Sequence, residues 1–162
     1  MTAMTPARTA PDLSFLLDHT SHVLRTQMSA ALGEIGLTAR MHCVLVHALE
    51  EERTQIQLAE IGDMDKTTMV VTVDALESAG LAERRPSSRD RRARIIAVTE
   101  KGAALAQRSQ AIVDRVHGEA LTALGTADRA ALLKALNALA AGHLATPVES
   151  PRAVRRARQT AK

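Results

Sequence analysis

The stretch that decides the fold runs from Thr54 to Gly80: TQIQLAEIGDMDKTTMVVTVDALESAG. Thr54 and Gln57 have the T-x-x-Q spacing of a capping box, in which each side chain accepts a hydrogen bond from a backbone N–H at a helix start. This spacing predicts a short helix that ends at Ile61. Gly62-Asp63 predicts a turn, and Asp65 predicts the N-cap of a second helix that ends at Gly80. Two helices joined by so tight a turn predict a helix-turn-helix.

A β-hairpin is predicted directly after the second helix. Leu81–Arg85 and the β-branched segment Ala93–Val98 have the composition of two short strands, and Pro86–Asp90 has turn residues. Six arginines fall within eleven residues here: Arg84, Arg85, Arg89, Arg91, Arg92 and Arg94. Arginine suits bidentate phosphate contacts and narrow minor grooves. The alternative is a solvated turn in which Asp90 pairs with one arginine, but the position after a helix-turn-helix favours DNA contact.

Amphipathic segments flank this lobe on both sides. Residues 11–36 have apolar side chains at helical spacing, and residues 99–144 predict one helix from the N-cap Thr99 to about Leu124 and another capped by Thr126. Thr38 predicts the N-cap of a helix to about Leu49, which the charge run Glu50-Glu51-Glu52 closes as a solvated segment. Long helices at both chain ends suit dimerisation.

The predicted fold is mainly α: a winged helix-turn-helix with a two-stranded β-wing and long terminal dimerisation helices. Five segments are expected: a disordered arm (1–10), a dimerisation helix (11–36), the DNA-binding lobe (37–98), dimerisation helices (99–144) and a disordered basic tail (145–162). Five basic residues and one acidic residue give the tail a charge of +4, within a total of +3. Added non-specific DNA affinity and simple solubilisation explain this tail equally well.

Composition excludes several classes of protein. Phe15 is the only aromatic residue, so stacking platforms for single-stranded nucleic acid are not expected. No Gly-rich phosphate loop, G-x-S-x-G or H-E-x-x-H motif occurs, so we predict no enzymatic activity and no cofactor. No apolar run suits a membrane span, the N-terminus is not a signal peptide, and a single cysteine suits a reducing compartment. We therefore expect a cytoplasmic protein without membrane contact.

From Leu37 to Gly102 the chain resembles the MarR (multiple antibiotic resistance regulator) family. The matching pieces, in chain order, are Leu37-Thr38, Leu58-Ala59-Glu60, Asp65-Lys66-Thr67-Thr68, Val73-Asp74-x-Leu76-Glu77, Gly80-Leu81, Glu83-Arg84-Arg85, Asp90-Arg91-Arg92-Ala93-Arg94 and Val98-Thr99-Glu100-Lys101-Gly102. The resemblance implies a homodimer joined by its terminal helices, with recognition helices in the major groove and wing arginines in the minor groove of double-stranded DNA. It also implies a repressor that a small-molecule inducer or oxidation often releases.

Carried onto this sequence, the resemblance makes Asp65–Ala75 the recognition helix, and helical spacing places Met69, Val73 and Leu76 on its core face. Arg92 is then the arginine that enters the minor groove, and Asp90 is its positioning partner. The predicted DNA-binding residues are Thr67, Thr68, Val70, Val71, Lys66, Arg40, Arg89, Asp90, Arg91, Arg92 and Arg94.

The recognition helix departs from the family pattern. Val70-Val71 stands where the family often has Thr-Arg, and Ala75 stands where it often has a basic residue. Exposed valines can contact thymine methyl groups, but the usual bidentate contact from arginine to guanine is missing. We therefore expect sequence readout to depend on the wing and on DNA shape.

The sequence leaves the sensed signal open. Cys43 is interpreted as a core thiol rather than a redox sensor. No dense metal motif is formed by the six histidines, which are His19, His22, His42, His47, His117 and His143. A small organic ligand is the default, and metal or redox sensing is the alternative. A further alternative is a winged helix that binds another protein, which salt-dependent binding to duplex DNA would distinguish.

Overall fold

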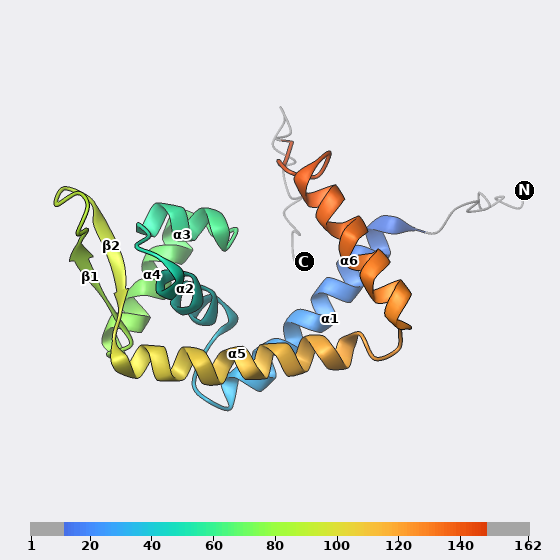
Figure 1. Cartoon of the computed structure of the whole chain (residues 1–162), viewed down its shortest axis with the longest axis horizontal. Coiled ribbons are helices and arrows are strands. Elements are labelled where there is room, and N and C mark those ends of the chain that lie inside the picture. Colours follow the sequence, from blue (N-terminus) through green and yellow to red (C-terminus); the bar gives the residue numbers. More distant parts are fainter. Residues whose placement is uncertain (1–11, 149–162) are drawn as a thin grey trace, which may run out of the picture. The chain divides into compact units, whose positions relative to one another are not determined.

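The computed structural model describes residues 12–148. Within that range it contains six helices and one antiparallel sheet: α1 (Leu13–Gly33), α2 (Ala39–Glu50), α3 (Gln55–Ile61), α4 (Lys66–Ser78), β1 (Ala82–Pro86), β2 (Arg94–Val98), α5 (Glu100–Ala120) and α6 (Thr126–Ala141). The predicted element order and the mainly helical, winged fold are confirmed (Figure 1). The predicted arm 1–10 and the tail beyond Val148 lie outside the described residues. In the described part, no helix combines the length and the hydropathy that a membrane crossing requires.

Two compact units divide the chain after Ala120, and the first contains the helix-turn-helix and the wing. An apolar core fills this unit. Its largest fully buried apolar side chains are Leu32, Leu45, Leu58, Met69, Leu76, Ile96, Val44 and Val73. Both α1 and α2 pack on α5, which runs along the base of the lobe in Figure 1. The side chains that α5 contributes to the core include Ala106 and Val113.

The wing is an antiparallel hairpin in which Ala82 faces Val98 and Pro86 faces Arg94. The second edge of β2 is also partnered, because Thr54 forms a β-bridge with Ile95, and the backbone N–H of Ile96 donates to the carbonyl of Arg53 at 3.1 Å. Backbone hydrogen bonds therefore attach the wing to the segment that begins α3.

Three predicted N-caps are confirmed by their geometry. Thr38, Thr54 and Asp65 each accept a hydrogen bond from the backbone N–H three residues later, at 3.1, 3.3 and 2.9 Å. Asp12 caps α1 in the same way, at 3.0 Å. Gly80 has a φ of +68°, and the next N–H reaches back to the carbonyl of Leu76 at 2.9 Å, as a glycine-terminated helix requires. These ends were predictable because each depends on residues within one turn.

Several boundaries differ from the predictions. Helix α5 ends at Ala120 rather than near Leu124, because the N–H of Leu124 bonds to the carbonyl of Leu121 (3.1 Å) in a tighter turn. The N-cap of α6 is Gly125, without a side-chain hydrogen bond, so Thr126 is the first helical residue and not the cap. The side chain of Arg129 donates to the carbonyl of Leu124 (2.8 Å) and stabilises this turn. Strand β1 begins one residue later than predicted, and so does β2.

Candidate nucleic-acid interface

The turn between α3 and α4 is set by hydrogen bonds and one unusual backbone angle. The capping box is complete, since the N–H of Thr54 also donates to Gln57 Oε1 at 2.8 Å. Asp63 has a φ of +49°, a left-handed conformation that aspartate tolerates. Asp65 then accepts hydrogen bonds from both the N–H (2.9 Å) and the hydroxyl (2.7 Å) of Thr68. The backbone hydrogen bond from Thr68 lowers the pKa of Asp65, so α4 starts on a charged carboxylate.

Helix α4 has the two faces that its sequence predicts. Met69, Val73 and Leu76 are buried. On the other side Val71 is 63% exposed, and Val70 is half-buried beside it. The remaining outward residues are Lys66, Thr67, Asp74 and Ala75. The helix therefore presents a surface of small residues to solvent, with its only cation in the first turn.

The six wing arginines fall into two groups, which their common spacing did not reveal. Arg84 belongs to the fold: its guanidinium pairs with Glu77, donates to Asp74 at 2.7 Å and donates to Gln55 Oε1 at 3.3 Å. Its backbone N–H also donates to Glu77 at 2.8 Å. Arg84 thus connects the base of the wing to α4 and α3. Arg85 pairs with Glu83 of its own strand.

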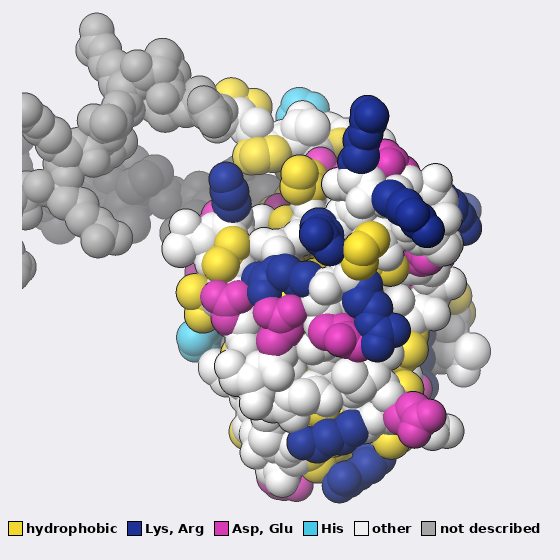
Figure 2. Space-filling view, turned by 90° about the vertical axis from the view of Figure 1, so that its left-hand side faces the viewer, with side chains coloured by type: hydrophobic (Ala, Val, Ile, Leu, Met, Phe, Trp, Pro, Cys, Tyr) yellow, Lys and Arg dark blue, Asp and Glu magenta, His cyan; other side chains and the backbone are white. Residues whose placement is uncertain are grey.

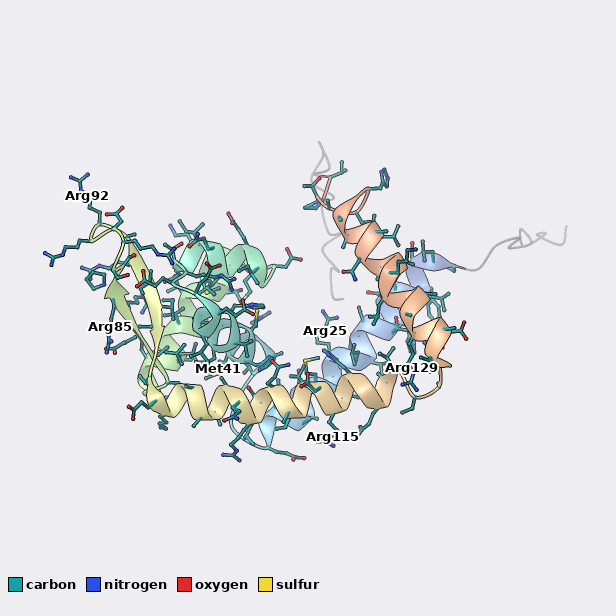
Figure 3. The ribbon with its side chains drawn as sticks, viewed as in Figure 1. Arg25, Met41, Arg85, Arg92, Arg115 and Arg129 are labelled. Carbon is teal, nitrogen blue, oxygen red and sulfur yellow. The ribbon has the colours of Figure 1, made fainter. Side chains whose placement is uncertain are left out.

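The second group consists of the four wing arginines that follow Pro86. Arg89, Arg91, Arg92 and Arg94 are exposed, and none of them forms a salt bridge with a carboxylate among residues 12–148. Figure 3 shows Arg92 at the tip of the hairpin, pointing away from the lobe. Arg89 lies near enough to the acidic side chain of Glu52 for its charge to act on it, and this exposed hairpin carries the positive charge that contact with a polyanion requires.

Asp90 shapes the wing tip, but through the backbone. Its carboxylate accepts a hydrogen bond from the backbone N–H of Arg92 at 2.9 Å, and its carbonyl accepts one from the N–H of Ala93, also at 2.9 Å. The sequence predicted Asp90 as a positioning partner for Arg92. The structure places its carboxylate on the main chain of that residue, which fixes the turn from which the Arg92 side chain extends.

A residue missed by the sequence analysis anchors the same tip. Glu52 accepts hydrogen bonds from the hydroxyl of Ser87 (2.7 Å) and the N–H of Ser88 (3.2 Å). The pKa of Glu52 is lowered by hydrogen bonds from the side chains of Ser88 and Ser87, with smaller contributions from the Ser88 backbone N–H and the charge of Arg89. The interpretation of Glu50-Glu51-Glu52 as a solvated charge run is therefore wrong for its last member, and Glu50 and Glu51 pair with Arg53 at 2.7 and 3.0 Å. The signal was absent from local sequence because Ser87 is 35 positions from Glu52.

The Thr-x-Lys-Gly motif attaches α5 to the end of α4. Thr99 donates its hydroxyl to the carbonyl of Gly80 and Lys101 donates its ammonium to the carbonyl of Ala79, both at 2.8 Å. A Cβ at Gly102 would lie 1.9 Å from the carbonyl oxygen of Leu81, so only glycine fits this approach. Lys101 therefore neutralises a helix C-terminus.

The other predicted contacts lie around this surface. Lys66 opens α4 and Arg40 lies in the first turn of α2, and both are exposed. Thr68 is half-buried and its hydroxyl is already bonded to Asp65. Figure 2 faces the wing side of Figure 1 and shows Lys and Arg side chains over this face, with acidic and hydrophobic side chains between them. The surface is thus mixed in charge.

Among the candidate sensor residues, Cys43, His42 and His47 on α2 are half-buried, whereas the other four histidines, His19, His22, His117 and His143, are exposed. Burial raises the pKa of the half-buried Cys43 thiol, which suits the interpretation as a core residue. His42 bonds through Nδ1 to the hydroxyl of the fully buried Ser109 at 2.8 Å, and that hydroxyl donates to the carbonyl of Ala106. Among residues 12–148, no group of three or more His, Cys, Asp or Glu side chains is arranged to hold a metal ion.

Comparisons with known proteins extend this picture. The model of the MarR family matches residues 35–93. CouR from Rhodococcus jostii RHA1, solved with p-coumaroyl-CoA, is 31% identical over 88% of this chain and 100% of that chain, with a TM-score of 0.76. A MarR-family transcriptional regulator from Rhodococcus sp. RHA1 is 30% identical over 82% of this chain and 98% of its own, with a TM-score of 0.73. The transcriptional repressor CouR bound to a 23-mer DNA duplex is 26% identical, covering 86% of this chain and 99% of that chain, with a TM-score of 0.74.

Proposed function

Since the chain belongs to the MarR family of winged helix-turn-helix transcription regulators, we propose that it represses transcription as a homodimer on a pseudo-palindromic operator, and that a small molecule releases it. The observation that carries DNA binding is the group of exposed wing arginines without acidic partners in the described residues, next to the exposed face of α4. The DNA-bound structure of the similar repressor CouR supports the same partner.

Each part of the lobe at residues 37–98 has a separate role in this proposal. Helix α4 enters the major groove, while Arg92 enters the minor groove from a tip that Asp90 shapes. Contacts to base edges come from Thr67, Val70 and Val71, beside Thr68, whose hydroxyl donates to Asp65. Contacts to phosphates come from Lys66, Arg40, Arg89, Arg91 and Arg94.

Dimerisation is proposed for the flanking helices, at residues 11–36 and 99–144. Large apolar side chains are exposed on α1 and α6, including Leu13, Phe15 and Leu16 on the first and Leu133 and Leu136 on the second. No residue of α6 is buried in the single chain. A helix with this much exposed leucine gains stability when a partner covers it. A symmetric dimer would present two recognition helices about one turn of DNA apart.

The inducer is proposed to be a small organic molecule, in line with the p-coumaroyl-CoA bound to the similar CouR. A hollow of about 470 Å³ between α1 and α5 is a candidate for its site. Ala30, Ala31 and Val116 supply apolar lining, and Arg115 supplies a cation for an acidic ligand. Arg115 lies 3.5 Å from Glu119, so a ligand carboxylate would compete with that pair.

Fluorescence anisotropy tests DNA binding most directly. The full chain is titrated against duplex DNA from upstream of its own gene, and against random duplex, at several salt concentrations. We expect tight binding, and the logarithm of the association constant should fall linearly with the logarithm of the salt concentration. Arg92→Ala should weaken binding and lower the salt slope by about 1. Arg108→Ala removes the same charge from an exposed position on α5 and is the matched control, with binding unchanged.

The opposite result is equally informative. Upstream DNA that binds no better than random duplex, with no effect of Arg92→Ala, would contradict operator recognition by the wing. Analytical ultracentrifugation of the same samples checks the dimer independently of the DNA chosen.

A further inference from the structure

The exposed face of α4 has almost no free hydrogen-bonding side chain. Thr72 donates its hydroxyl to the carbonyl of Thr68, and Ser78 donates its own to the carbonyl of Asp74, both at 2.8 Å. The hydroxyl of Thr68 donates to Asp65 at 2.7 Å. Thr72 is also buried, and a hydroxyl has only one proton, so Thr68 and Ser78 have none left to donate to a base edge.

The acidic residues of α4 are also occupied. Asp74 and Glu77 both bind the guanidinium of Arg84, which holds them against the base of the wing. Glu77 is held by both the guanidinium and the backbone N–H of Arg84, whereas Asp74, 58% exposed, contacts Arg84 through one oxygen and keeps the other as an acceptor. One guanidinium offsets half of the negative charge of the two carboxylates.

The free hydrogen-bond donors of α4 are Lys66 and Thr67, in the first turn of the helix. In the next turn the outward surface is apolar: Val71 is 63% exposed, with Val70 beside it. Between Lys66 and Ser78 the sequence contains no Arg, Asn or Gln, the side chains that make bidentate contacts with purines. The outward face between Thr67 and Asp74 can thus offer only van der Waals contact.

In the major groove, thymine carries the one large apolar feature, its C5 methyl group. A valine pressed against a guanine or an unmethylated cytosine would cover polar edges without satisfying them, which costs free energy. We propose that Val71, supported by Val70, adds a preference for thymine to each half-site by packing on its methyl group, beside the readout by the wing and by DNA shape. This inference rests on the proposed function, because it requires α4 to lie in the major groove.

The experiment uses the full chain and a duplex obtained by selection from a random library. Each thymine of the selected site is replaced in turn by deoxyuridine, which removes only the C5 methyl group. At one or two positions per half-site, affinity should fall about fourfold, the loss expected for one buried methyl group. In Val71→Ala the same replacement should have no effect, and the salt slope should be unchanged because no charge is lost.

Val148→Ala is the matched control, because it removes the same two methyl groups from a side chain that is 96% exposed at the other end of the chain. This variant should keep the fourfold preference for thymine. Thermal unfolding of Val71→Ala should match the wild type, since an exposed valine contributes little to the core.

The outcomes separate this inference from the proposal beneath it. A salt-sensitive, selected duplex that binds equally well with uracil at every position would overturn the role of Val71 and leave operator binding intact. The role of Val71 would also be overturned if Val71→Ala lost as much affinity as the wild type when thymine is replaced by uracil. If no duplex is selected above random sequence, both proposals fail, and the valine face is better explained as a protein-binding surface.

Discussion

Arg84 and Arg92 belong to the same dense basic stretch, but the contacts of their side chains differ. The side chain of Arg84 is 31% exposed and its guanidinium contacts two carboxylates and an amide on two helices. Arg92 extends from the hairpin tip with no carboxylate partner in the described part of the chain. Removing Arg84 should therefore affect folding and wing position, whereas removing Arg92 should affect only the contact with DNA.

Arg84→Met tests the first half of this distinction. Methionine retains much of the apolar stem but leaves Asp74 and Glu77 as neighbouring carboxylates without their cation. We expect the free energy of unfolding to fall by about 1 kcal/mol, a modest value because the pairs are partly solvated. Urea denaturation measures this. Arg85→Met is the control, since the pair of Arg85 with Glu83 is more exposed. Equal stability of the two variants would contradict a structural role for Arg84.

The sequence predicted the arginines of the wing, and the family resemblance singled out Arg92, but neither indicated the structural contacts of Arg84. Counting charges shows how many arginines are present, whereas their neutralisation depends on residues brought close by the fold. Asp74 is ten positions before Arg84, on a different element, and nothing in the local pattern indicates that its carboxylate points toward the wing. The buried face of α4 was predictable in contrast, because helical spacing alone places Met69, Val73 and Leu76 together.

His42 gives a second prediction at this scale. Burial lowers its pKa, the charges of His47 and His117 lower it further, and Asp114 opposes them. The folded state thus binds the proton less well than the unfolded chain, whose value is near 6.5. Stability should fall as the pH drops through and below that value and should be fully retained above it.

Chemical denaturation between about pH 7 and pH 5 measures this loss. His42→Gln removes the titrating group and should flatten the dependence over this range. His143→Gln alters an exposed histidine outside the lobe and should leave the wild-type dependence in place. A slope that persists in His42→Gln would show that another group is responsible.

At the scale of elements, the wing is connected to the lobe at three levels. Arg84 joins its base to α4, β2 bridges to the start of α3, and Glu52 binds the tip. A two-stranded hairpin alone is marginally stable in water, so these attachments determine how rigidly the tip is presented. In the proposed complex, a preformed wing would reduce the entropy that the arginines lose on binding DNA.

Glu52→Ala should loosen the tip without unfolding the lobe. We expect faster amide hydrogen exchange at Ser88, whose N–H bonds to the Glu52 carboxylate, and weaker DNA binding. The pKa of Glu52 is lowered, so the contact is fully formed above the ordinary glutamate value of 4.5 and is lost as the pH falls through the folded-state pKa. Glu60→Ala removes an exposed carboxylate from α3 and is the control. Identical exchange at Ser88 in both variants would rule out the anchor.

Helix starts were predictable from sequence at this scale, and one helix end was not. Thr38, Thr54 and Asp65 cap their helices through bonds to residues three positions away, so the signal is local. The end of α5 near Ala120 has no comparable signal, since Leu121 and Leu124 continue the apolar pattern while the backbone forms a tighter turn. Thr126 has a favourable side chain for an N-cap, which is why the sequence predicted it there. The extended backbone of Gly125 places the glycine at the N-cap position instead.

For the whole molecule, the first unit has its own core, whereas α6 has no buried residue. Isolated helices of this length are marginal in water, so α6 depends on packing for its stability. The proposed homodimer would supply that packing and would give the long helices a role beside so small a lobe. It would also double the wing arginines and allow both halves of a pseudo-palindrome to be bound at once.

The double variant Leu133→Glu/Leu136→Glu tests this arrangement. Two charges on the apolar face of α6 should oppose dimerisation, because charge buried at an interface is costly without a partner. We expect analytical ultracentrifugation to give the monomer mass and the melting temperature to lose its dependence on protein concentration. Binding to a full operator should fall by at least tenfold, while weak, salt-sensitive binding to a single half-site remains. Lys134→Glu introduces a charge on the same helix outside the leucine face and should remain dimeric.

Inserting about five base pairs between half-sites, half a turn of DNA, should reproduce the loss with the unaltered protein, because the second recognition helix would then face the wrong side of the duplex. A double variant that stays dimeric would place the interface elsewhere, whereas full operator affinity in a monomer would show that one lobe is sufficient for recognition.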